Sequence, residues 1–459
     1  MEKKWIVPFA ILMLVSALGM FIPAAPANAD AKPIAPADVA WMLTATGLVF
    51  LMTPGLSFFY GGMVSRRNVI STVLQSFIAL GVISILWVVC GFSLAFGESL
   101  GAEKLGLIGN PLTFWMFNGV GASTHEALSP TIPLVLFALF QLKFAILTPA
   151  LITGSFAERV RFSSYLLFIC LFSVFIYAPL AHWTWHPNGF LRNWGVLDFA
   201  GGTVVHMSAG FAALAGTLFL GPRKSHRAGQ THAPANIPLV VLGTGMLWFG
   251  WFGFNAGSAL AANETATLAF LTTNTASAAA MLSWIFFDGV RGRKPSALGA
   301  CVGAVVGLVA ITPAAGYVSV GASMFIGAIA SVISNLAVHW KNQSTLDDTL
   351  DVFPCHGVGG IVGVIATGIF AQDVGLIFGK TETFFYHLLT IAVVGVYTFG
   401  GSYLLYKVTD MLIPMRVREE QERVGLDLSQ HGESVDDQVA IAASDEPHEA
   451  TSGRLASVN

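Results

Sequence analysis

Long apolar stretches occupy most of this 459-residue chain, and they constrain its fold more than any other feature. Each is close to the ~20 residues that an α-helix needs to cross the hydrocarbon core of a bilayer. Backbone N–H and C=O groups find no water there, so each stretch must form a helix that satisfies them internally. The predicted spans are 38–62, 70–96, 131–157, 164–182, 200–221, 238–260, 268–287, 296–312, 316–340, 354–372 and 383–411. The sequence therefore predicts an all-α polytopic membrane protein with about eleven transmembrane helices.

The composition agrees with this class and excludes others. The chain is 54% hydrophobic and only 11% charged, with a mean hydropathy of +0.69, far from the average of soluble domains. A net charge of -3 without a basic face argues against binding to nucleic acid. Because the chain is so apolar, membrane lipid is expected to surround it. The four cysteines (Cys90, Cys170, Cys301 and Cys355) fall inside or against apolar segments. They are expected to be packing residues and not a disulfide framework.

The N-terminus has the pattern of a secretory signal peptide. In "MEKKWIVPFAILMLVSALGMFIPAAPANAD", Lys3 and Lys4 precede an apolar run that ends in the small-residue sequence Ala27-Asn28-Ala29. This pattern predicts a signal peptide over residues 1–29, cut after Ala29. The alternative is an uncleaved first helix.

Charged loop residues give the orientation. With an outward mature N-terminus, the predicted inner loops hold Arg66, Arg67, Arg159, Arg161, Arg223, Lys224, Arg227, Arg291, Arg293, Lys294 and Lys341. The outer segments hold only Lys32, Lys104, Arg192 and Lys380. The positive-inside rule then places a transmembrane domain (30–411) in the inner (plasma) membrane and a tail (412–459) in the cytoplasm. The tail stretch "REEQERVGLDLSQHGESVDD" is expected to become ordered on a partner, and the remainder to be disordered.

Two segments resemble each other and suggest internal symmetry. "HMSAGFAALAGTLF" and "HGVGGIVGVIATGIF" each begin with a histidine (His206, His356) and have a glycine four residues later (Gly210, Gly360). They belong to the fifth and tenth predicted helices, so the two halves run in opposite senses. This predicts two inverted five-helix repeats plus a final helix, as in many transporters. Chance similarity between two glycine-rich helices is the alternative.

The two histidines are candidate functional groups, because ionisable side chains inside a bilayer cost about 2.5–3.5 kcal/mol and usually mark a pathway. Facing each other as neutral rings, they could share a proton and guide a small polar solute. Counting 1.5 Å per residue along straight helices leaves about 10 Å between their depths, so they meet only if both helices begin below the surface. Asp198 and Asp351, shortly before the histidines, are suited to cap such helix starts. The alternative is two unrelated core histidines.

Aromatic residues suggest where a cation would first bind. Phe140 and Phe144 share one helix face, and Trp251, Phe254 and Ser258 share another. Phe140, Phe144, Ser258 and Trp185 all fall toward the outer ends of their predicted helices. Aromatic faces attract a desolvated cation by about 1–2 kcal/mol, and a serine oxygen can accept from N–H. A recruitment site for a small cation is therefore predicted, with an interfacial aromatic belt as the alternative.

Five segments resemble the ammonium transporter (Amt/Mep) family, in family order: "DFAGGTVVH", "GWFGFNAGSA", "AERVRF", "DVFPCHGVGGIVG" and "REEQERVGLDLSQHGE". The resemblance implies a homotrimer with one pore per subunit that carries ammonium or its analogue methylammonium, no cofactor or metal, and no enzymatic activity. It implies an ammonium site formed by Phe144, Trp185 and Ser258, with Phe140 beside it, and a gate of stacked Phe144 and Phe254. It also implies a lumen lined by Trp251, His206 and His356, with Asp198 as structural support. The tail resembles the segment near which PII-type signalling proteins dock.

Lys143 departs from the family pattern, since an uncharged residue is expected between Phe140 and Phe144. On a helical wheel it points away from Phe140 on the side opposite Phe144, toward lipid or a subunit contact; at the pore mouth it would repel ammonium. Two other function classes compete with transport. An ammonium sensor would use the same fold to signal to a cytoplasmic partner, although the sequence carries no recognisable output domain. An intramembrane metalloenzyme or haem protein lacks a third ligand at motif spacing.

Overall fold

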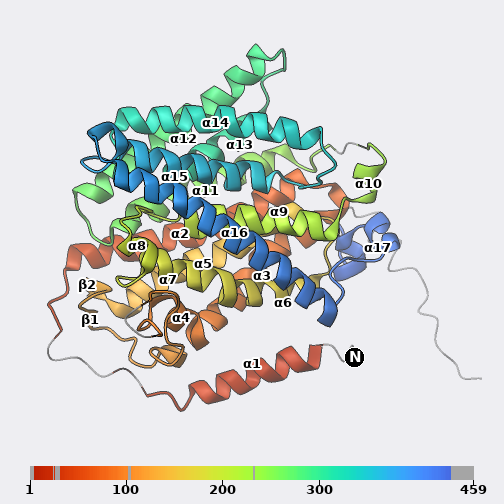
Figure 1. Cartoon of the computed structure of the whole chain (residues 1–459). Coiled ribbons are helices and arrows are strands. Elements are labelled where there is room, and N and C mark those ends of the chain that lie inside the picture. Colours follow the sequence, from red (N-terminus) through yellow and green to blue (C-terminus); the bar gives the residue numbers. More distant parts are fainter. Residues whose placement is uncertain (1–4, 24, 26–30, 102–104, 231–232, 436–459) are drawn as a thin grey trace, which may run out of the picture.

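A computed structural model of the chain describes residues 5–23, 25, 31–101, 105–230 and 233–435. The long helices lie side by side along one common direction and form a bundle (Figure 1), as predicted for an all-helical chain. The α-helices are α1 (Ile6–Gly19), α2 (Pro36–Met63), α3 (Val69–Leu86), α4 (Phe92–Phe96), α5 (Leu134–Phe156), α6 (Phe162–Phe172), α7 (Ala178–Trp185), α8 (Phe190–Asn193), α9 (Ser208–Leu220), α10 (Lys224–Arg227), α11 (Ile237–Ala256), α12 (Glu264–Val290), α13 (Ala297–Ile311), α14 (Val320–Asn342), α15 (Gly359–Phe370), α16 (Thr381–Leu412) and α17 (Glu419–Val424).

All eleven predicted spans are helical. Among the described residues, nine helical segments are long and apolar enough to cross a membrane. The remaining two predicted spans, 268–287 and 296–312, correspond to α12 and α13. α12 has 27 residues but many of them are threonine, serine and asparagine, and α13 has only 15, a length of roughly 22 Å.

Several of these helices contain wider, π-helical turns. Two of these turns join consecutive α-helices: Trp87–Gly91 joins α3 to α4, and Ser173–Tyr177 joins α6 to α7. Two others, Gly202–Met207 before α9 and Phe353–Val358 before α15, carry the two histidines of the sequence repeat. Single π turns are frequent at functional sites, and their matching positions in the two halves strengthen the repeat found in the sequence.

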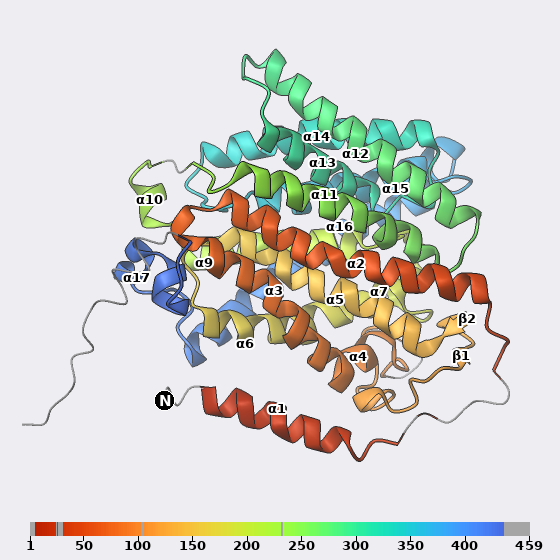
Figure 2. The same cartoon turned by 180° about the vertical axis from the view of Figure 1, so that it is seen from behind.

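A small β-hairpin departs from the all-α prediction. β1 (Thr124–His125) and β2 (Ser129–Pro133) pair antiparallel immediately before α5. The segment is too short and polar to show the alternating pattern of a longer strand. We call the end of the bundle that carries β1 and β2 the hairpin end, and the opposite end, which carries α10 and α17, the tail end (Figures 1 and 2).

The start of the tail packs on its own bundle at the tail end. α17 is followed by a π-helical turn, Asp427–His431. The Asp427 carboxylate accepts hydrogen bonds from the backbone N–H groups of Ile70 (3.0 Å) and Ser71 (2.7 Å), and the N–H of Leu426 donates to the Asn68 side chain at 2.7 Å. This part of the tail is therefore ordered against its own bundle, because the first turn of α3 offers it unpaired backbone donors; ordering on a partner stays a prediction.

Replacing Asp427 with alanine should loosen this tail segment. Hydrogen bonds to a charged group contribute about 1.5–3 kcal/mol, so local opening should become at least about tenfold more frequent. Hydrogen–deuterium exchange of residues 419–431 measures this directly. Glu419→Ala is the control, because that carboxylate is 75% exposed and its pairing with Lys224 is worth little. Unchanged exchange in Asp427→Ala would contradict the docking.

Helix α1 lies to one side of the bundle (Figure 2), and none of its residues is buried. The predicted cleavage site at residues 27–29 lies outside the described residues. The four cysteines are free, and Cys301 and Cys355 are buried, in line with a packing role.

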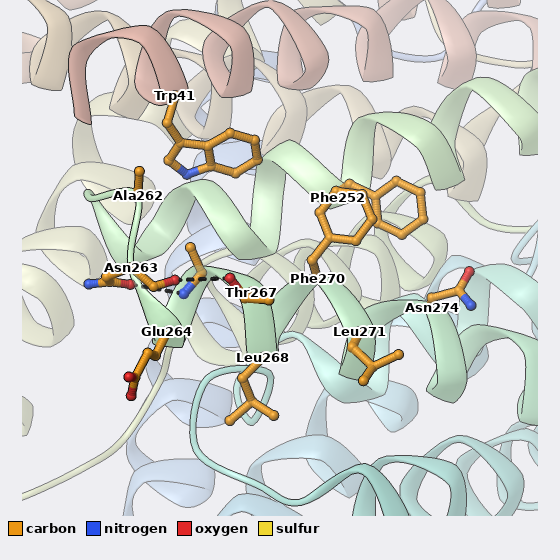
Figure 3. A pocket seen from close by; sticks show the side chains of 11 residues that line it. Trp41, Phe252, Ala262, Asn263, Glu264, Thr267, Leu268, Phe270, Leu271 and Asn274 are labelled. Carbon is orange, nitrogen blue, oxygen red and sulfur yellow. Dashed lines mark hydrogen bonds between the residues drawn. The ribbon is translucent and has the colours of Figure 1, made fainter. Parts of the chain in front are cut away.

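An apolar hollow marks one side of the bundle. It has a volume of about 1070 Å³ and lies between the start of α2, the end of α11 and the first half of α12 (Figure 3). Trp41 and Leu271 line it, together with the rings of Phe252 and Phe270, which stack at 4.0 Å. This side face is separate from the histidines.

Candidate functional site

His206 and His356, 150 residues apart in sequence, face each other in the interior. Their Nδ1 atoms are 3.3 Å apart and their ring centroids 5.4 Å apart. His206 is fully buried and His356 is 4% exposed. The estimate of about 10 Å between their depths is wrong, because both helices begin inside the bundle: nearly every residue of the two π turns is buried.

Glycines let the two helices approach closely enough for this contact. A Cβ on Gly210 would lie 2.3 Å from the Gly357 Cα, and a Cβ on Gly360 would lie 3.2 Å from the His206 Cβ. The later residue Gly210 therefore lies against the earlier Gly357, and the later Gly360 lies against the earlier His206. The two helices α9 and α15 thus run in opposite directions where they cross. This explains why a glycine follows each histidine by four residues.

Asp198 caps the first of these helices, as predicted. Its carboxylate accepts from the backbone N–H groups of Gly201 (2.8 Å), Gly202 (2.6 Å) and Thr203 (2.7 Å). Gly201 has φ +117°, a conformation that favours glycine. An anionic acceptor at a helix start satisfies otherwise orphaned N–H groups in a buried place, and so holds His206 below the surface.

The corresponding prediction for Asp351 is wrong, because Asp348 is the cap. The Asp348 carboxylate accepts from the backbone N–H groups of Val352 (3.1 Å) and Phe353 (2.7 Å). Asp351 has φ +58° and pairs with Lys341 at 2.6 Å. The sequence did contain the correct indication, since Asp198 and Asp348 each precede a histidine by eight residues. Burial raises the pKa of Asp348 to about 6, against the opposing charge of Lys341.

A line of aromatic rings leads from the hairpin end to the histidines. Trp185 packs edge-on against Phe144 (5.7 Å), and Phe144 stacks on Phe254 (4.1 Å, 29° between planes). The centroid of the Phe254 ring lies 6.1 Å from that of the His206 ring. Phe140 packs behind Phe144 at 5.0 Å and is fully buried. The two faces predicted from helical spacing therefore come together across α5 and α11.

A cavity of about 510 Å³ opens at the hairpin end and reaches Phe144. Trp185, Ser258 and Asp198 also line it. The sequence did not identify its further polar lining residues, among them Gln141, Thr184, Arg192, Asn263 and Tyr317. Nothing in a single sequence distinguishes these from other polar residues near helix ends.

Two contacts orient the residues at the floor of this cavity. The Ser258 hydroxyl donates to the Phe254 carbonyl at 2.8 Å, which leaves its oxygen lone pairs free to accept from a solute. The Trp185 indole N–H donates to the Asp198 carbonyl at 3.1 Å. Asp198 therefore supports both sides of the site: its backbone holds Trp185 and its side chain holds the helix start of His206.

Trp251 stacks on His206 (5.4 Å, 20° between planes) and its indole N–H donates to the Thr312 hydroxyl at 2.9 Å. The same hydroxyl lies 3.3 Å from His206 Nε2. Thr312 was not among the predicted site residues, because it stands at the end of the predicted span 296–312 and belongs to no distinguishing motif.

Lys143 lies away from the cavity. Its ammonium group is 5.3 Å from the centroid of the Phe50 ring on α2, and Phe50 is 46% exposed. The wheel-based direction, away from Phe144, is the one found. The charged end therefore lies on the outer surface of the bundle, where a long side chain can extend toward a polar region.

Replacing Lys143 with methionine should leave substrate uptake within about twofold of the wild type, because methionine keeps the packing on Phe50 and no charge is removed from the cavity. Uptake into proteoliposomes measures this. Phe144→Ala, one position further on, is the comparison and should alter uptake strongly. A large change in Lys143→Met would place the ammonium group within electrostatic reach of the cavity.

A network of buried charges lies at the tail end, below His356. Arg223 pairs with Glu158 and Asp347, both at 2.7 Å, and the fully buried Arg159 donates to the Asp347 carbonyl at 2.7 Å and the Thr349 hydroxyl at 2.8 Å. Burial alone would raise the pKa of Asp347, but hydrogen bonds from Arg223 and the charge of Arg159 outweigh burial and hold that pKa well below its usual range. The network fixes the segment that carries the Asp348 cap.

The arrangement suits the passage of a small polar solute. Aromatic faces and a serine acceptor stand at the floor of an open cavity, and a pair of buried imidazoles lies directly behind stacked phenylalanines. Within the described ranges, no group of three or more His, Cys, Asp or Glu side chains is placed to hold a metal ion.

Comparisons with known proteins agree with this geometry. The profile of the Ammonium Transporter Family matches residues 40–435. An ammonium transporter of Aquifex aeolicus is 44% identical over 403 residues, covering 86% of this chain and 92% of that protein. The structure of Candida albicans Mep2 superposes with a TM-score of 0.80 at 33% identity (92% of this chain and 94% of that chain), and a structure named Sensor Amt Protein with 0.79 at 30% identity (86% and 98%). The chain therefore belongs to the ammonium transporter family.

Proposed function

We propose that this ammonium transporter recruits ammonium at the cavity on its hairpin end, removes a proton at the phenylalanine stack, and conducts ammonia past the histidine pair into the cytoplasm. The observation that carries the proposal is the 3.3 Å contact between two buried imidazoles placed directly behind the stacked Phe144 and Phe254.

Recruitment uses the floor of the cavity. Ammonium loses part of its water shell there and gains the faces of Phe144 and Trp185, worth about 1–2 kcal/mol when desolvated. Its N–H groups donate to Ser258, whose own proton is committed to Phe254. Phe140, behind Phe144, fixes the ring position.

Selection follows at the gate formed by Phe144 and Phe254. A charged solute that passes between buried rings incurs a large desolvation cost, and ammonium avoids this cost by giving up its proton. The proton is either returned to the outer solution through the cavity or carried across by the histidine pair. Potassium has a similar size and charge but has no proton to lose. The neutral molecule then meets Trp251, His206 and His356, whose ring nitrogens offer hydrogen bonds within an apolar wall.

Orientation and assembly complete the proposal. The basic side chains counted as inner by the positive-inside rule include Arg67, Arg223 and Lys224, which lie at the tail end. This supports our proposal that the tail end faces the cytoplasm. The opposite senses of α9 and α15 support two inverted five-helix repeats followed by α16.

The homotrimer is proposed from the family, with the apolar hollow near Trp41 and Phe270 as part of the subunit contact. Native mass spectrometry in detergent tests the trimer.

A sensor remains the second candidate function. The observation in its favour is the likeness to the Sensor Amt Protein structure, together with the docking of the tail on the bundle beside the loop after α9. A cytoplasmic partner, such as a PII-type signalling protein, would bind at this end. Uptake by the purified protein alone distinguishes the two functions, because a pure sensor carries no substrate.

The decisive experiment is a solid-supported-membrane or liposome recording. Full-length protein is reconstituted, an ammonium pulse is applied, and current and methylammonium uptake are measured for wild type, His206→Ala and His356→Ala. We expect both variants to lose uptake, or to lose selectivity so that potassium also passes, because removal of an imidazole leaves its partner without a hydrogen bond and widens the passage.

The matched control is His339→Ala, since His339 is a half-buried residue near the end of α14 and, among the described residues, its side chain bonds only to those of Arg293 and Gln343. It should behave as the wild type. Potassium pulses belong in every series. Normal selective methylammonium uptake in both pore variants would remove the histidine pair from the mechanism.

A further inference from the structure

The Thr312 hydroxyl lies between two pore residues. It is 2.9 Å from the Trp251 indole nitrogen and 3.3 Å from His206 Nε2. Thr312 is fully buried, so water does not compete for these contacts. Each hydrogen bond around this oxygen can be assigned a direction, because a hydroxyl has one proton and two lone pairs.

The proton of the hydroxyl is already committed. Thr312 Oγ1 donates to the Leu308 carbonyl at 2.7 Å. At this end of α13 the Thr312 backbone N–H donates to Val309 instead, at 3.2 Å, so the hydroxyl replaces the helical donor that the Leu308 carbonyl would otherwise receive. Turning the hydroxyl toward His206 would leave that buried carbonyl unpaired, at a cost of about 1–3 kcal/mol.

Both lone pairs of the Thr312 hydroxyl oxygen must therefore accept hydrogen bonds. The Trp251 indole is only a donor and occupies one of them. His206 faces the other, so the bond between His206 Nε2 and Thr312 forms only when Nε2 carries the proton. A neutral imidazole has one N–H, and His206 Nδ1 is then bare.

The protonation of His206 also determines which nitrogen of His356 carries the proton. With His206 Nδ1 bare, the 3.3 Å contact is a hydrogen bond only if His356 Nδ1 donates, which leaves His356 Nε2 bare. We propose that Thr312 is a positioning residue that fixes the proton order of the histidine pair, with His206 protonated on Nε2 and His356 on Nδ1.

The inference rests on the proposed function and refines it. The two rings have different roles: the N–H of His206 Nε2 is held by Thr312, and His356 Nε2 is the free acceptor of the pair. A passing solute must donate an N–H to it. Ammonia can do so, whereas a dehydrated alkali cation has no hydrogen to offer.

The test reads the ring protons directly. Full-length protein labelled with ¹⁵N-histidine is placed in lipid bilayers, and the ring nitrogen resonances of His206 and His356, each assigned by its loss in the His→Gln variant, are recorded. We expect the Nε2–H form for His206 and the Nδ1–H form for His356. Thr312→Val removes the hydroxyl at similar volume and should convert His206 partly or wholly to the Nδ1–H form. Thr312→Ser restores the hydroxyl and should restore the wild-type spectrum.

Methylammonium uptake by the same samples gives the functional readout. We expect about tenfold slower uptake in Thr312→Val and a rate within twofold of wild type in Thr312→Ser; Thr312→Ala replaces the valine variant if the latter is not monodisperse. Thr244→Val is the matched control, because that buried hydroxyl on α11 donates to Val240 in the same way. A wild-type His206 protonated on Nδ1, or an unchanged spectrum in the variants that lack the hydroxyl, would overturn the role of Thr312. A wild type that carries no methylammonium would instead overturn the transport proposal.

Discussion

Replacing Gly210 with alanine should lower the free energy of unfolding by about 3 kcal/mol and abolish uptake. The added Cβ would lie 2.3 Å from both the Cα and the N of Gly357, and backbone atoms cannot move aside as a flexible side chain can. Overpacking typically costs about 1–3 kcal/mol, and a contact with backbone belongs at the upper end. Any relaxation must push α9 and α15 apart, which separates His206 from His356.

Thermal unfolding in detergent and methylammonium uptake in proteoliposomes measure the two effects. Gly245→Ala on α11 is the matched control: a Cβ there meets nothing within 4 Å, so the better helix propensity of alanine should stabilise the protein by about 0.5–1 kcal/mol. The same substitution thus has opposite signs at the two sites. A variant Gly210→Ala with wild-type melting and uptake would show that the two helices are not held by this contact.

The second large effect is expected from Arg159→Met. This side chain is fully buried and donates to Ser155, Asp347 and Thr349. Removing one member of a buried charge network leaves its partners uncompensated, at about 3–5 kcal/mol. Because the network fixes the segment that carries Asp348, uptake should fall with stability. Lys224→Met is the control, since Lys224 is 49% exposed and pairs with an exposed Glu419; its effect should stay below about 1 kcal/mol.

The same network predicts a pH dependence of stability. Burial would raise the pKa of Glu158 and of Asp347, but Arg223 outweighs it and lowers both values. A carboxylate whose folded-state pKa is depressed stabilises the protein above its unfolded pKa, near 4, and this contribution is lost as the pH falls below that value. Asp347→Asn should therefore be clearly less stable than wild type at pH 7, and the difference should shrink below about pH 4. A difference that stays constant with pH would contradict the assignment.

Apolar length and family motifs predicted much of this molecule. All eleven predicted spans are helical, because a chain without water around it has no other way to pair its backbone. The match to the Ammonium Transporter Family and the similarity to known ammonium transporters confirm the predicted family. They also confirm the prediction that the chain is not an enzyme, since members of this family are transporters. The spacing of Phe140 and Phe144, and of Trp251 and Phe254, placed these residues on the faces where they are found, since short-range helical geometry depends on local sequence alone.

Errors arose where the answer depended on segments distant in sequence. The histidine separation was wrong because a straight-helix count cannot show that loops descend into the bundle before α9 and α15. The prediction for Asp351 is wrong because the cap of the second helix is Asp348, which precedes His356 by the same eight residues that separate Asp198 from His206. The docking of the tail on its own bundle was not predicted, because the donors it binds belong to α3, more than 350 residues earlier.

Hydropathy, helical periodicity and motifs identify this chain as a helical membrane protein of the ammonium transporter family, because they are properties of contiguous residues. Which side chains meet became visible only in the folded chain: Gly210 lies against Gly357, Thr312 lies between Trp251 and His206, and Arg159 lies within its buried network. Each of these contacts joins two helices. Close packing and buried hydrogen bonds set the relative depth and the crossing of these helices, and residue spacing within one helix predicts neither the depth nor the crossing.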